Sequence, residues 1–267
     1  MDLGLAGKTA LVAASSEGLG FATAKALALE GARVWIGSRD ASKTRDAVEK
    51  LTAAAAAVDG AWVEGAPLDM ADGDSIARWV AGASAAYGGG IDALVINSGG
   101  PPPGRFSDFG DDAWRAAFDL LLLSAVRLVR AALPGLGERK GAVLVVSSTS
   151  VKEPIDGLIL SNSLRSATVA LAKSLSAELA PAGIRVNCLA PGRIATGRIE
   201  RIDRANAERA DISPDEAKRR AAAAIPLGRY GEADEFGKTA CWLLSPAASY
   251  ITGQVLSADG GMLKGTW

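Results

Sequence analysis

The fold is decided by residues 13–20, Ala13-Ala14-Ser15-Ser16-Glu17-Gly18-Leu19-Gly20, which join a short apolar run to a segment of helical periodicity. A tight turn that runs straight into a helix offers unpaired backbone N–H groups and the positive end of the helix dipole to a pyrophosphate. Gly18 permits a close approach of the backbone to that group, and Gly20 lets the helix lie close to the strand. Two glycines in a turn are common, but these stand at the first junction of strand and helix, which predicts a dinucleotide-binding turn.

Ala14 stands where such turns usually have their first glycine. Alanine can serve there only if its φ stays negative, because a Cβ is strained at positive φ. We therefore expect a negative φ at Ala14, together with an altered turn geometry or cofactor affinity.

Outward from this turn, short apolar runs alternate with longer helix-period segments. Most runs are continuous in Val, Ile, Leu and Ala, which is typical of strands buried on both faces of a parallel sheet. The predicted strands are Lys8–Ala13, Arg33–Gly37, Ala61–Gly65, Ala93–Asn97, Gly141–Ser147, Arg185–Leu189 and Gln254–Ser257. The predicted helices are Gly18–Glu30, Ala41–Ala57, Asp74–Tyr87, Asp112–Leu133, Asn162–Leu179 and Ala233–Leu244. The alternation predicts an α/β fold, a Rossmann-type doubly wound parallel sheet of seven strands in a single domain over residues 1–267.

The composition is that of a globular protein, with 29 basic and 30 acidic residues among 267 and no histidine. The missing histidine excludes a Ser-His-Asp triad, a Cys-His pair and any histidine-ligated metal site within one chain, and we expect no metal. The balanced charge gives no reason to expect nucleic acid as a partner, and no apolar run approaches the roughly 20 residues of a membrane helix. Cys188 and Cys241 lie in apolar stretches, which indicates buried thiols in a reducing cytoplasm. The N-terminus lacks the basic region of a signal peptide, so we expect a cytoplasmic protein without a membrane partner.

Residues 197–226 interrupt the alternation with many charges of both signs and no strand. Ser213, Pro214 and Glu216 predict a helix start there, because Ser caps, Pro fits the first turn and Glu can reach back. The segment is either a solvated helical surface or a lid over a ligand crevice. We favour the lid-like insertion, because so long an excursion follows the carboxyl end of a strand, where such sheets bind ligands.

The second predicted strand is followed by Ser38 and Arg39. Dinucleotide folds place an acidic residue near here when the ribose 2′-hydroxyl is free, whereas a guanidinium suits a 2′-phosphate. The pair favours NADP(H) over NAD. NAD remains the alternative, since Arg39 can equally be a surface residue past a strand end.

Further segments match the short-chain dehydrogenases/reductases in order and spacing across the whole chain. They are Asp69, Ile96-Asn97-Ser98-Gly99, Ile184–Gly192, Thr196, Pro226–Arg229 and Thr252–Gly261. Within this family the chain is most similar to 3-oxoacyl-(acyl carrier protein) reductases. The resemblance implies that Asp69 contacts adenine and that Thr196 helps to hold the nicotinamide carboxamide. The full set of implied cofactor contacts is Ser15, Ser16, Gly18, Leu19, Gly20, Ser38, Arg39, Asp69, Asn97, Ser98, Gly99, Arg165, Pro191, Gly192, Ile194 and Thr196.

The chain departs from the family at the active site. The family has a serine, a tyrosine thirteen residues later, a lysine four residues after that, and an asparagine on an earlier helix. In an ungapped register these positions hold Ser148, Ser161, Arg165 and Leu121. A serine hydroxyl is far less acidic than a phenol of pKa ~10, and a guanidinium does not give up its proton. We take Ser148, Ser161 and Arg165 as the candidate catalytic residues of a site that is deficient in proton transfer.

Three functions remain open. The first is a reductase of a carbonyl or alcohol substrate, such as a 3-oxoacyl thioester, whose proton donor is water, Ser161 or Lys152, although Lys152 is more readily a solvated loop lysine. The second is an inactive NADP(H)-binding sensor or partner subunit. The third is other chemistry on a bound ligand, with Arg165 and Arg193 as anion clamps. We favour the first, because a sensor of adenine nucleotides would not need the nicotinamide-side residues Pro191, Gly192 and Thr196.

The loop Gly99–Gly104 follows the fourth predicted strand, and it is either a plain rigid loop or a wall of the substrate site. Its glycines let backbone approach a ligand, and its prolines stiffen the chain. Phe106, Ile155, Leu158 and Ile159 would add apolar surface, which suits a hydrophobic acyl chain or a cyclic ketone. The predicted helix Asp112–Leu133 is apolar nearly all round, so we expect a second buried face and a homo-oligomer, dimer or tetramer.

Overall fold

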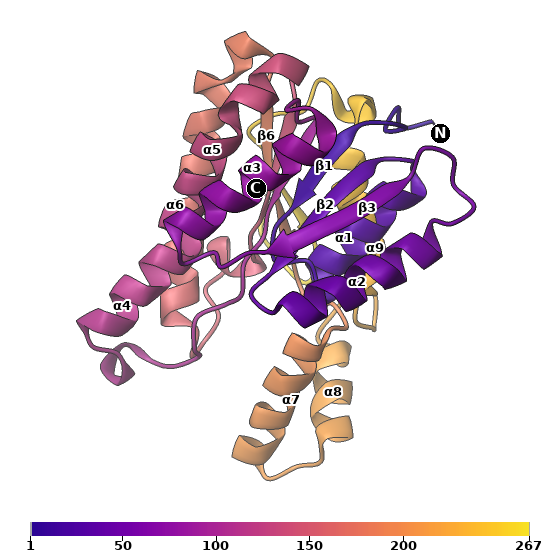
Figure 1. Ribbon diagram of the computed structural model, residues 1–267. Helices are drawn as coiled ribbons and strands as arrows, with labels where there is room; N and C mark the ends of the chain where they lie inside the picture. The colour runs from indigo at the N-terminus through magenta and orange to yellow at the C-terminus, as the bar shows by residue number, and fades with distance from the viewer. Residues whose placement is uncertain (1, 267) are drawn as a thin grey trace.

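A computed structural model describes residues 2–266 of the protein. Its centre is one sheet of seven parallel strands in the order β3-β2-β1-β4-β5-β6-β7 (Figure 1). The strands are β1 Thr9–Val12, β2 Arg33–Ser38, β3 Trp62–Pro67, β4 Ala93–Ile96, β5 Ala142–Val146, β6 Arg185–Pro191 and β7 Val255–Ala258. The predicted doubly wound α/β fold is thereby confirmed.

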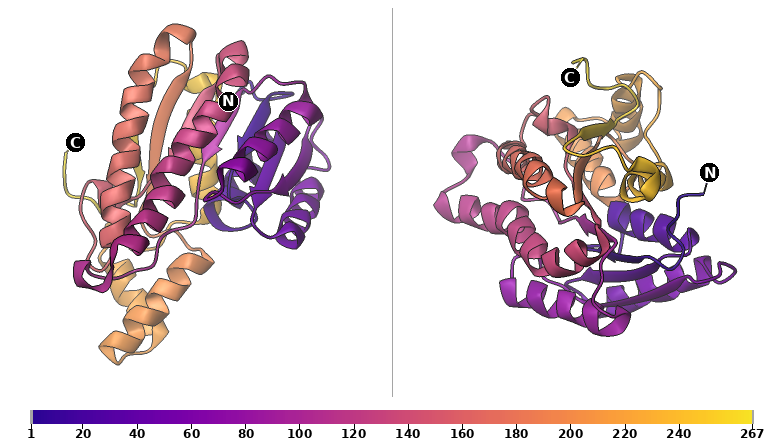
Figure 2. Two further views of the ribbon diagram at one scale, coloured as in Figure 1. Left: turned by 60° about the vertical axis from the view of Figure 1, so that its left-hand side comes forward. Right: turned by 90° about the horizontal axis from the view of Figure 1, so that it is seen from above.

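Helices cover both faces of the sheet, and this explains the continuous apolar runs. In β1, Ala10 and Val12 pack in one core while Leu11 packs in the other, and all three are at most 1% exposed. On the first face lie α1 Gly18–Leu29, α2 Ala41–Ala54 and α9 Ala233–Leu244. On the second face lie α3 Gly73–Tyr87, α5 Ser124–Arg139 and α6 Ile159–Glu178. Figure 2 shows the two layers from above.

The helix predicted over Asp112–Leu133 is longer and less regular than expected. It consists of α4 (Asp111–Phe118), a π-helical turn, η2 (Asp119–Leu123), and α5. α5 continues through Pro134 to Arg139, although proline removes one helical hydrogen bond. Pro134 and Arg130 are both exposed, so solvent can satisfy the carbonyl that proline leaves unpaired.

The segment 197–226 forms two helices, α7 (Gly197–Ala210) and α8 (Pro214–Ala223), which pack on each other and project from the body (Figures 1 and 2). The predicted start at Ser213 is confirmed, because its Oγ accepts a hydrogen bond from the Glu216 N–H at 3.2 Å. The first helix was not expected. Thr196 caps it by accepting from the Ile199 N–H at 3.5 Å.

Both cysteines are buried free thiols, as predicted, and burial raises the pKa of each to about 12. Across residues 2–266, no helix combines the length and apolar character needed to cross a bilayer. In the same range, no three His, Cys, Asp or Glu side chains gather as metal ligands would.

Candidate functional site

The candidate site lies at the carboxyl edge of the sheet, where β1 and β4 are neighbours and the strand order reverses direction. In such sheets the loops that leave this edge diverge and open a crevice for ligands. The predicted cofactor and catalytic residues lie in the segments that follow β1 to β6, except Ser38 and Pro191, which are the last residues of β2 and β6.

The turn after β1 presents the uncapped N-terminus of α1. Glu17 precedes the helix and makes no side-chain hydrogen bond to it, and the first turn holds no acidic side chain. The amide N–H groups of Gly18, Leu19 and Gly20 are therefore left for a ligand, as a pyrophosphate requires. Gly18 has φ +61°, and a Cβ there would meet only the Thr196 methyl group, at 3.8 Å. The residues present thus fit a dinucleotide.

The expected negative φ at Ala14 is wrong: the value is +46°, in the left-handed region. The turn therefore keeps the conformation that glycine usually serves, at a cost of about 1–2 kcal/mol for alanine. The Ala14 carbonyl is fixed by the Asn97 side chain, whose Nδ2 donates to it at 2.9 Å. A Cβ on Gly20 would collide with this carbonyl and come within 2.9 Å of Asn97 Nδ2. Asn97 thus holds the turn in place, and Gly20 has to be glycine.

Ser15 was predicted to contact cofactor, but its hydroxyl is fully buried. It donates to the Val12 carbonyl at 2.6 Å and accepts from the Gly37 N–H at 3.2 Å, so it joins β1 to β2. Any cofactor contact of Ser15 would have to come from backbone. Ser16 is half-buried in the same turn and forms no side-chain hydrogen bond within residues 2–266.

Arg39 is exposed just past β2, and it takes part in no ion pair within residues 2–266. Ser38 hydrogen-bonds to Thr44 Oγ1 at 2.8 Å and to the Asp40 carbonyl at 3.0 Å. The Asp40 carboxylate is turned to α2, where it accepts from Ser42 and Lys43, and these bonds lower its pKa. The nearby acid is therefore used as a helix cap, and the guanidinium is the group that remains free.

After β3, Asp69 is half-buried and its Oδ1 accepts from the Ala71 N–H at 2.9 Å. After β4, the half-buried Ser98 donates to the exposed Gly99 carbonyl at 3.1 Å. A Cβ on Gly99 would meet nothing within 4 Å, so open space lies beside it.

The residues predicted to contact nicotinamide lie at the end of β6 and just after it. Pro191 pairs with Ala258, and a Cβ on Gly192 would come within 2.7 Å of Asp259 Cβ, so glycine allows β7 to approach. The Ile194 side chain is 5% exposed and packs in the core, which leaves only its backbone for a cofactor. Its carbonyl accepts from Thr196 Oγ1 at 3.3 Å.

Ser148 and Ser161 lie on different elements. Ser148 is half-buried at the end of β5, where its Oγ accepts from the Ser150 N–H at 3.1 Å and keeps its own proton free to donate. Ser161 is buried in the first turn of α6, and its Oγ accepts from Arg165 Nε at 3.3 Å. The hydroxyls of Ser147 and Ser150, on either side of Ser148, are buried without a partner in the described part of the chain. Lys152 is exposed on the next loop.

Arg165 is held over the carboxyl ends of two strands. Its Nη1 donates to the Val146 and Ser147 carbonyls at 3.0 and 3.4 Å, and its Nη2 donates to the Gly99 carbonyl at 3.5 Å. Burial, and next the cation of Arg198, lower its pKa to about 10. Arg165 is therefore still a cation at neutral pH, and it takes up the space next to Ser161.

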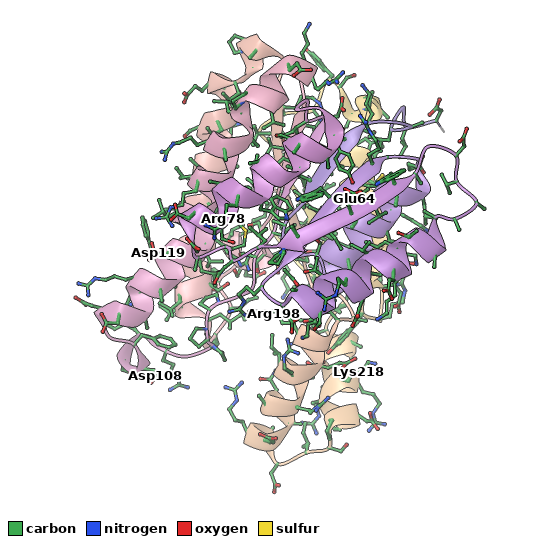
Figure 3. All side chains as sticks on the ribbon, viewed as in Figure 1. Glu64, Arg78, Asp108, Asp119, Arg198 and Lys218 are labelled. Atoms are coloured by element: carbon green, nitrogen blue, oxygen red, sulfur yellow. The ribbon has the colours of Figure 1, made fainter. Side chains whose placement is uncertain are left out.

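Arg193 is not an anion clamp. Its guanidinium bonds to Asp203 Oδ1 at 2.7 Å and to the Tyr230 hydroxyl at 3.2 Å, and so ties α7 to the body. Arg198, which we did not predict, faces the crevice instead. Its guanidinium lies so close to Gly100 that a Cβ there would collide with it. Figure 3 shows Arg198 where the hairpin joins the body. Its position two residues past Thr196 was the available sequence signal.

The loops after β4 and β5 form one wall. Gly104 bridges to Leu158, and Gly104 N–H donates to the Gly157 carbonyl at 2.7 Å. On these loops Phe106 and Ile155 are 74% and 40% exposed, while Leu158 and Ile159 are half-buried.

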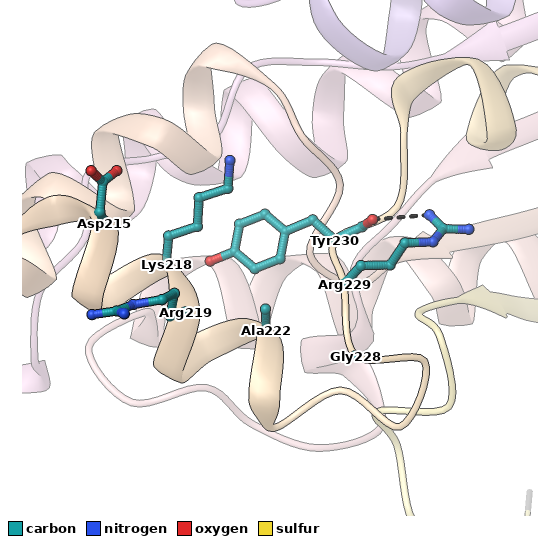
Figure 4. A pocket seen from close by; sticks show the side chains of 7 residues that line it. All are labelled: Asp215, Lys218, Arg219, Ala222, Gly228, Arg229 and Tyr230. Atoms are coloured by element: carbon teal, nitrogen blue, oxygen red, sulfur yellow. Dashed lines mark hydrogen bonds between the residues drawn. The ribbon is translucent and has the colours of Figure 1, made fainter.

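A hollow of about 370 Å³ lies between α8 and residues 228–230 (Figure 4). Its lining includes Lys218, Arg219, Arg229 and Tyr230. The Tyr230 hydroxyl donates to Asp203 Oδ2 at 2.8 Å, and Lys218 Nζ lies 5.9 Å from the centre of its ring. None of the predicted cofactor or catalytic residues lines this hollow, and Tyr230 serves there to hold the hairpin.

Comparison with known proteins agrees with this geometry. Residues 13–263 match the family model described as enoyl-(acyl carrier protein) reductase. The chain is 31% identical over 259 residues to the 3-oxoacyl-(acyl-carrier-protein) reductase FabG of Chlamydia trachomatis serovar D, covering 97% of this chain and 98% of the relative.

Two solved structures are also similar. L-sorbose reductase from Gluconobacter frateurii, complexed with NADPH and L-sorbose, superposes with a TM-score of 0.92 at 28% identity, covering 99% of this chain and 100% of the other. An NADPH-bound short chain oxidoreductase from Pseudomonas aeruginosa PAO1, described as containing an atypical catalytic center, superposes with a TM-score of 0.87 at 28% identity over 97% and 98% of the two chains.

Proposed function

Because this chain belongs to the short-chain dehydrogenase/reductase family, we propose that it transfers hydride between NADP(H) and the carbonyl or alcohol carbon of a small substrate. One observation carries the proposal: the uncapped N-terminus of α1 faces Thr196, so the turn that would hold pyrophosphate and the residues that would hold nicotinamide meet at one crevice. A sensor of adenine nucleotides would need only the first of these.

NADP(H) is supported over NAD by the strand end after β2. Arg39 is free and exposed, while the carboxylate of Asp40 is engaged with the first amides of α2. A guanidinium and a 2′-phosphate make strong charge-assisted hydrogen bonds. Both similar structures named above hold NADPH.

The chain's own residues would bind the substrate and move its proton. Bound NADPH supplies the hydride. The free Ser148 proton is available to the carbonyl oxygen, and the Arg165 cation stabilises negative charge that develops on that oxygen. The proton that completes the alcohol comes from Ser161 or from water, because Lys152 lies exposed on its loop. A non-standard donor is in keeping with the atypical center of the Pseudomonas aeruginosa oxidoreductase.

We propose the substrate class by two features. Apolar surface at Phe106 and Ile155 suits an acyl chain or a ring beside the carbonyl, and a 3-oxoacyl thioester fits that description. The α7–α8 hairpin stands next to the crevice through Arg198 and would act as its lid. We further propose a homodimer or homotetramer in a reducing cytoplasm, which agrees with the two free thiols.

The test is NADPH oxidation against 3-oxoacyl thioesters, small ketones and oxo acids, beside a titration with NADPH and NADH. We expect turnover with at least one class and a 10²–10³-fold slower reaction in Ser148→Ala, as for the loss of one oxyanion donor. Tight NADPH binding without turnover of any of these thioesters, ketones or oxo acids would contradict the proposal.

A further inference from the structure

Two guanidinium groups from different helices, Arg165 of α6 and Arg198 of α7, contact neighbouring glycines of the loop after β4. Arg165 donates to the Gly99 carbonyl at 3.5 Å, and the Arg198 guanidinium packs on Gly100, where only a glycine leaves room for it. Arg201 lies one turn further along α7, and its Nη1 would be 3.7 Å from a Cβ on Gly197. Positive charge is thus concentrated where the hairpin meets the loop after β4.

No carboxylate among residues 2–266 serves as a counter-ion for this charge. Within residues 2–266, none of the three arginines pairs with a carboxylate, and Arg198 donates no hydrogen bond. Burial lowers the pKa of both Arg165 and Arg198, and for each a neighbouring arginine contributes. Like charges that are drawn partly out of water raise the free energy of the site, and an anion placed between them removes that cost.

The two arginines differ in what they have free to offer. Arg165 already donates to three backbone carbonyls, so its orientation is fixed. Arg198 has its whole planar fork available, and this fork matches the two oxygens of a carboxylate. Arg165 therefore supplies a positive charge in a fixed position, and Arg198 supplies two N–H donors that can bind both oxygens of a carboxylate.

The two arginines lie near Ser148, the residue proposed to bind the substrate carbonyl. The carbonyls of Val146 and Ser147, which hold Arg165, directly precede Ser148. A pyrophosphate would have its own donors at the N-terminus of α1, where a Cβ on Gly18 would meet the Thr196 methyl group. We propose that Arg198, with Arg165 behind it, selects a carbonyl substrate that carries a carboxylate close to the reacting carbon, as in an oxo acid. This narrows the substrate class and rests on the proposed reductase function.

The test compares 2-oxobutanoate and 4-oxopentanoate with their neutral methyl esters in NADPH oxidation. We expect a kcat/KM preference for the acids of roughly 10–100-fold, the value of a charge-assisted hydrogen-bonded pair, and its loss in Arg198→Ala with an unchanged Kd for NADPH. Arg204→Ala removes a charge from an exposed position of the same helix and should keep the preference. Equal turnover of acids and esters by the unmodified protein overturns the proposal. A rise in the Kd for NADPH in Arg198→Ala as large as the loss of the preference for acids also overturns it, because Arg198 would then bind the cofactor phosphates.

A binding measurement separates this inference from the reductase function. The NADPH-saturated protein is titrated with oxamate, a carboxylate that cannot be reduced, by calorimetry. Binding that is lost in Arg198→Ala and kept in Arg204→Ala supports the carboxylate site even if no substrate turns over. Turnover of neutral ketones without any Arg198-dependent oxamate binding keeps the reductase and rejects the site.

Discussion

At the scale of single residues, we propose that the active site is altered by replacement rather than by simple loss. In the ungapped register Arg165 falls on the family's lysine position and Ser161 on its tyrosine position, and the two side chains are joined by a hydrogen bond of 3.3 Å. The positive charge is retained beside Ser148, whereas a serine hydroxyl, a much weaker acid than a phenol, takes the place of the family's tyrosine. Under the proposed function, such a site would polarise a carbonyl through Ser148 and Arg165 and take its proton from Ser161 or from water.

Ala14 gives a prediction about stability. Its φ of +46° is strained for alanine and ordinary for glycine, whose greater chain entropy offsets part of the gain. We expect Ala14→Gly to raise the free energy of unfolding by about 1 kcal/mol and the Tm by roughly 2–4 °C. Calorimetry measures both. A lower Tm in Ala14→Gly would show that this φ costs nothing.

Arg39 gives a prediction about cofactor choice. Arg39→Asp replaces the free guanidinium with a carboxylate, which repels a 2′-phosphate and can accept from a ribose hydroxyl. We expect the Kd for NADPH to rise roughly 10–100-fold and the Kd for NADH to fall or stay constant. Arg45→Ala, an exposed charge on α2, is the control. Unchanged affinity for NADPH in Arg39→Asp contradicts the assignment.

At the scale of elements, the α7–α8 hairpin depends on a few polar contacts. Arg193 and Tyr230, on the body, both bond to Asp203 of α7, and the exposed face of the hairpin carries weaker pairs such as that between Arg219 and Glu216. The hairpin is therefore attached to the body through the middle of α7.

Asp203→Ala should loosen this attachment, because it leaves a half-buried guanidinium and a buried hydroxyl without their acceptor. We expect the free energy of unfolding to fall by about 2–3 kcal/mol, which is less than for the loss of a fully buried ion pair. We also expect faster amide hydrogen exchange throughout α7 and α8. Arg219→Ala, which breaks only an exposed pair, should change stability by less than about 0.5 kcal/mol. If the amides of α7 and α8 exchange equally slowly in the two variants, the contacts of Asp203 with Arg193 and Tyr230 do not hold the hairpin.

Sequence patterns predicted the seven strands to within two residues, because strands buried on both faces leave continuous apolar runs. The sequence patterns did not predict local conformation where contacts between distant segments determine it. The φ of Ala14 is set by Asn97, 83 positions away, and α7 begins at a threonine cap that the charged segment hid. The π-helical turn at Leu121 could not be predicted, since its carbonyl is tied to Thr168 of α6 at 3.3 Å. The sequence offers Arg193 as an anion clamp of the third function, and only the fold shows that Asp203 engages it.

At the scale of the whole molecule, α4 and α5 leave apolar side chains uncovered. Phe118 and Leu133 are 42% and 37% exposed there, and Leu122 and Leu123 between them are half-buried. Contact with a second copy along these helices would cover them. We expect light scattering to give the mass of a dimer or tetramer of the 27.2 kDa chain, and Leu133→Glu to shift it toward the monomer. A monomer of the unmodified protein over a range of concentrations refutes the oligomer.

Single-turnover oxidation of NADPH carrying deuterium in either the 4R or the 4S position, with the oxo acids and ketones above, tests whether the site reduces a carbonyl with Ser161 and Arg165 at the family's tyrosine and lysine positions. We expect substrate-dependent oxidation that one of the two labels slows, together with transfer of that deuterium to the product alcohol. Saturable NADPH binding with no substrate-dependent oxidation, or oxidation without deuterium in a product, would contradict this expectation.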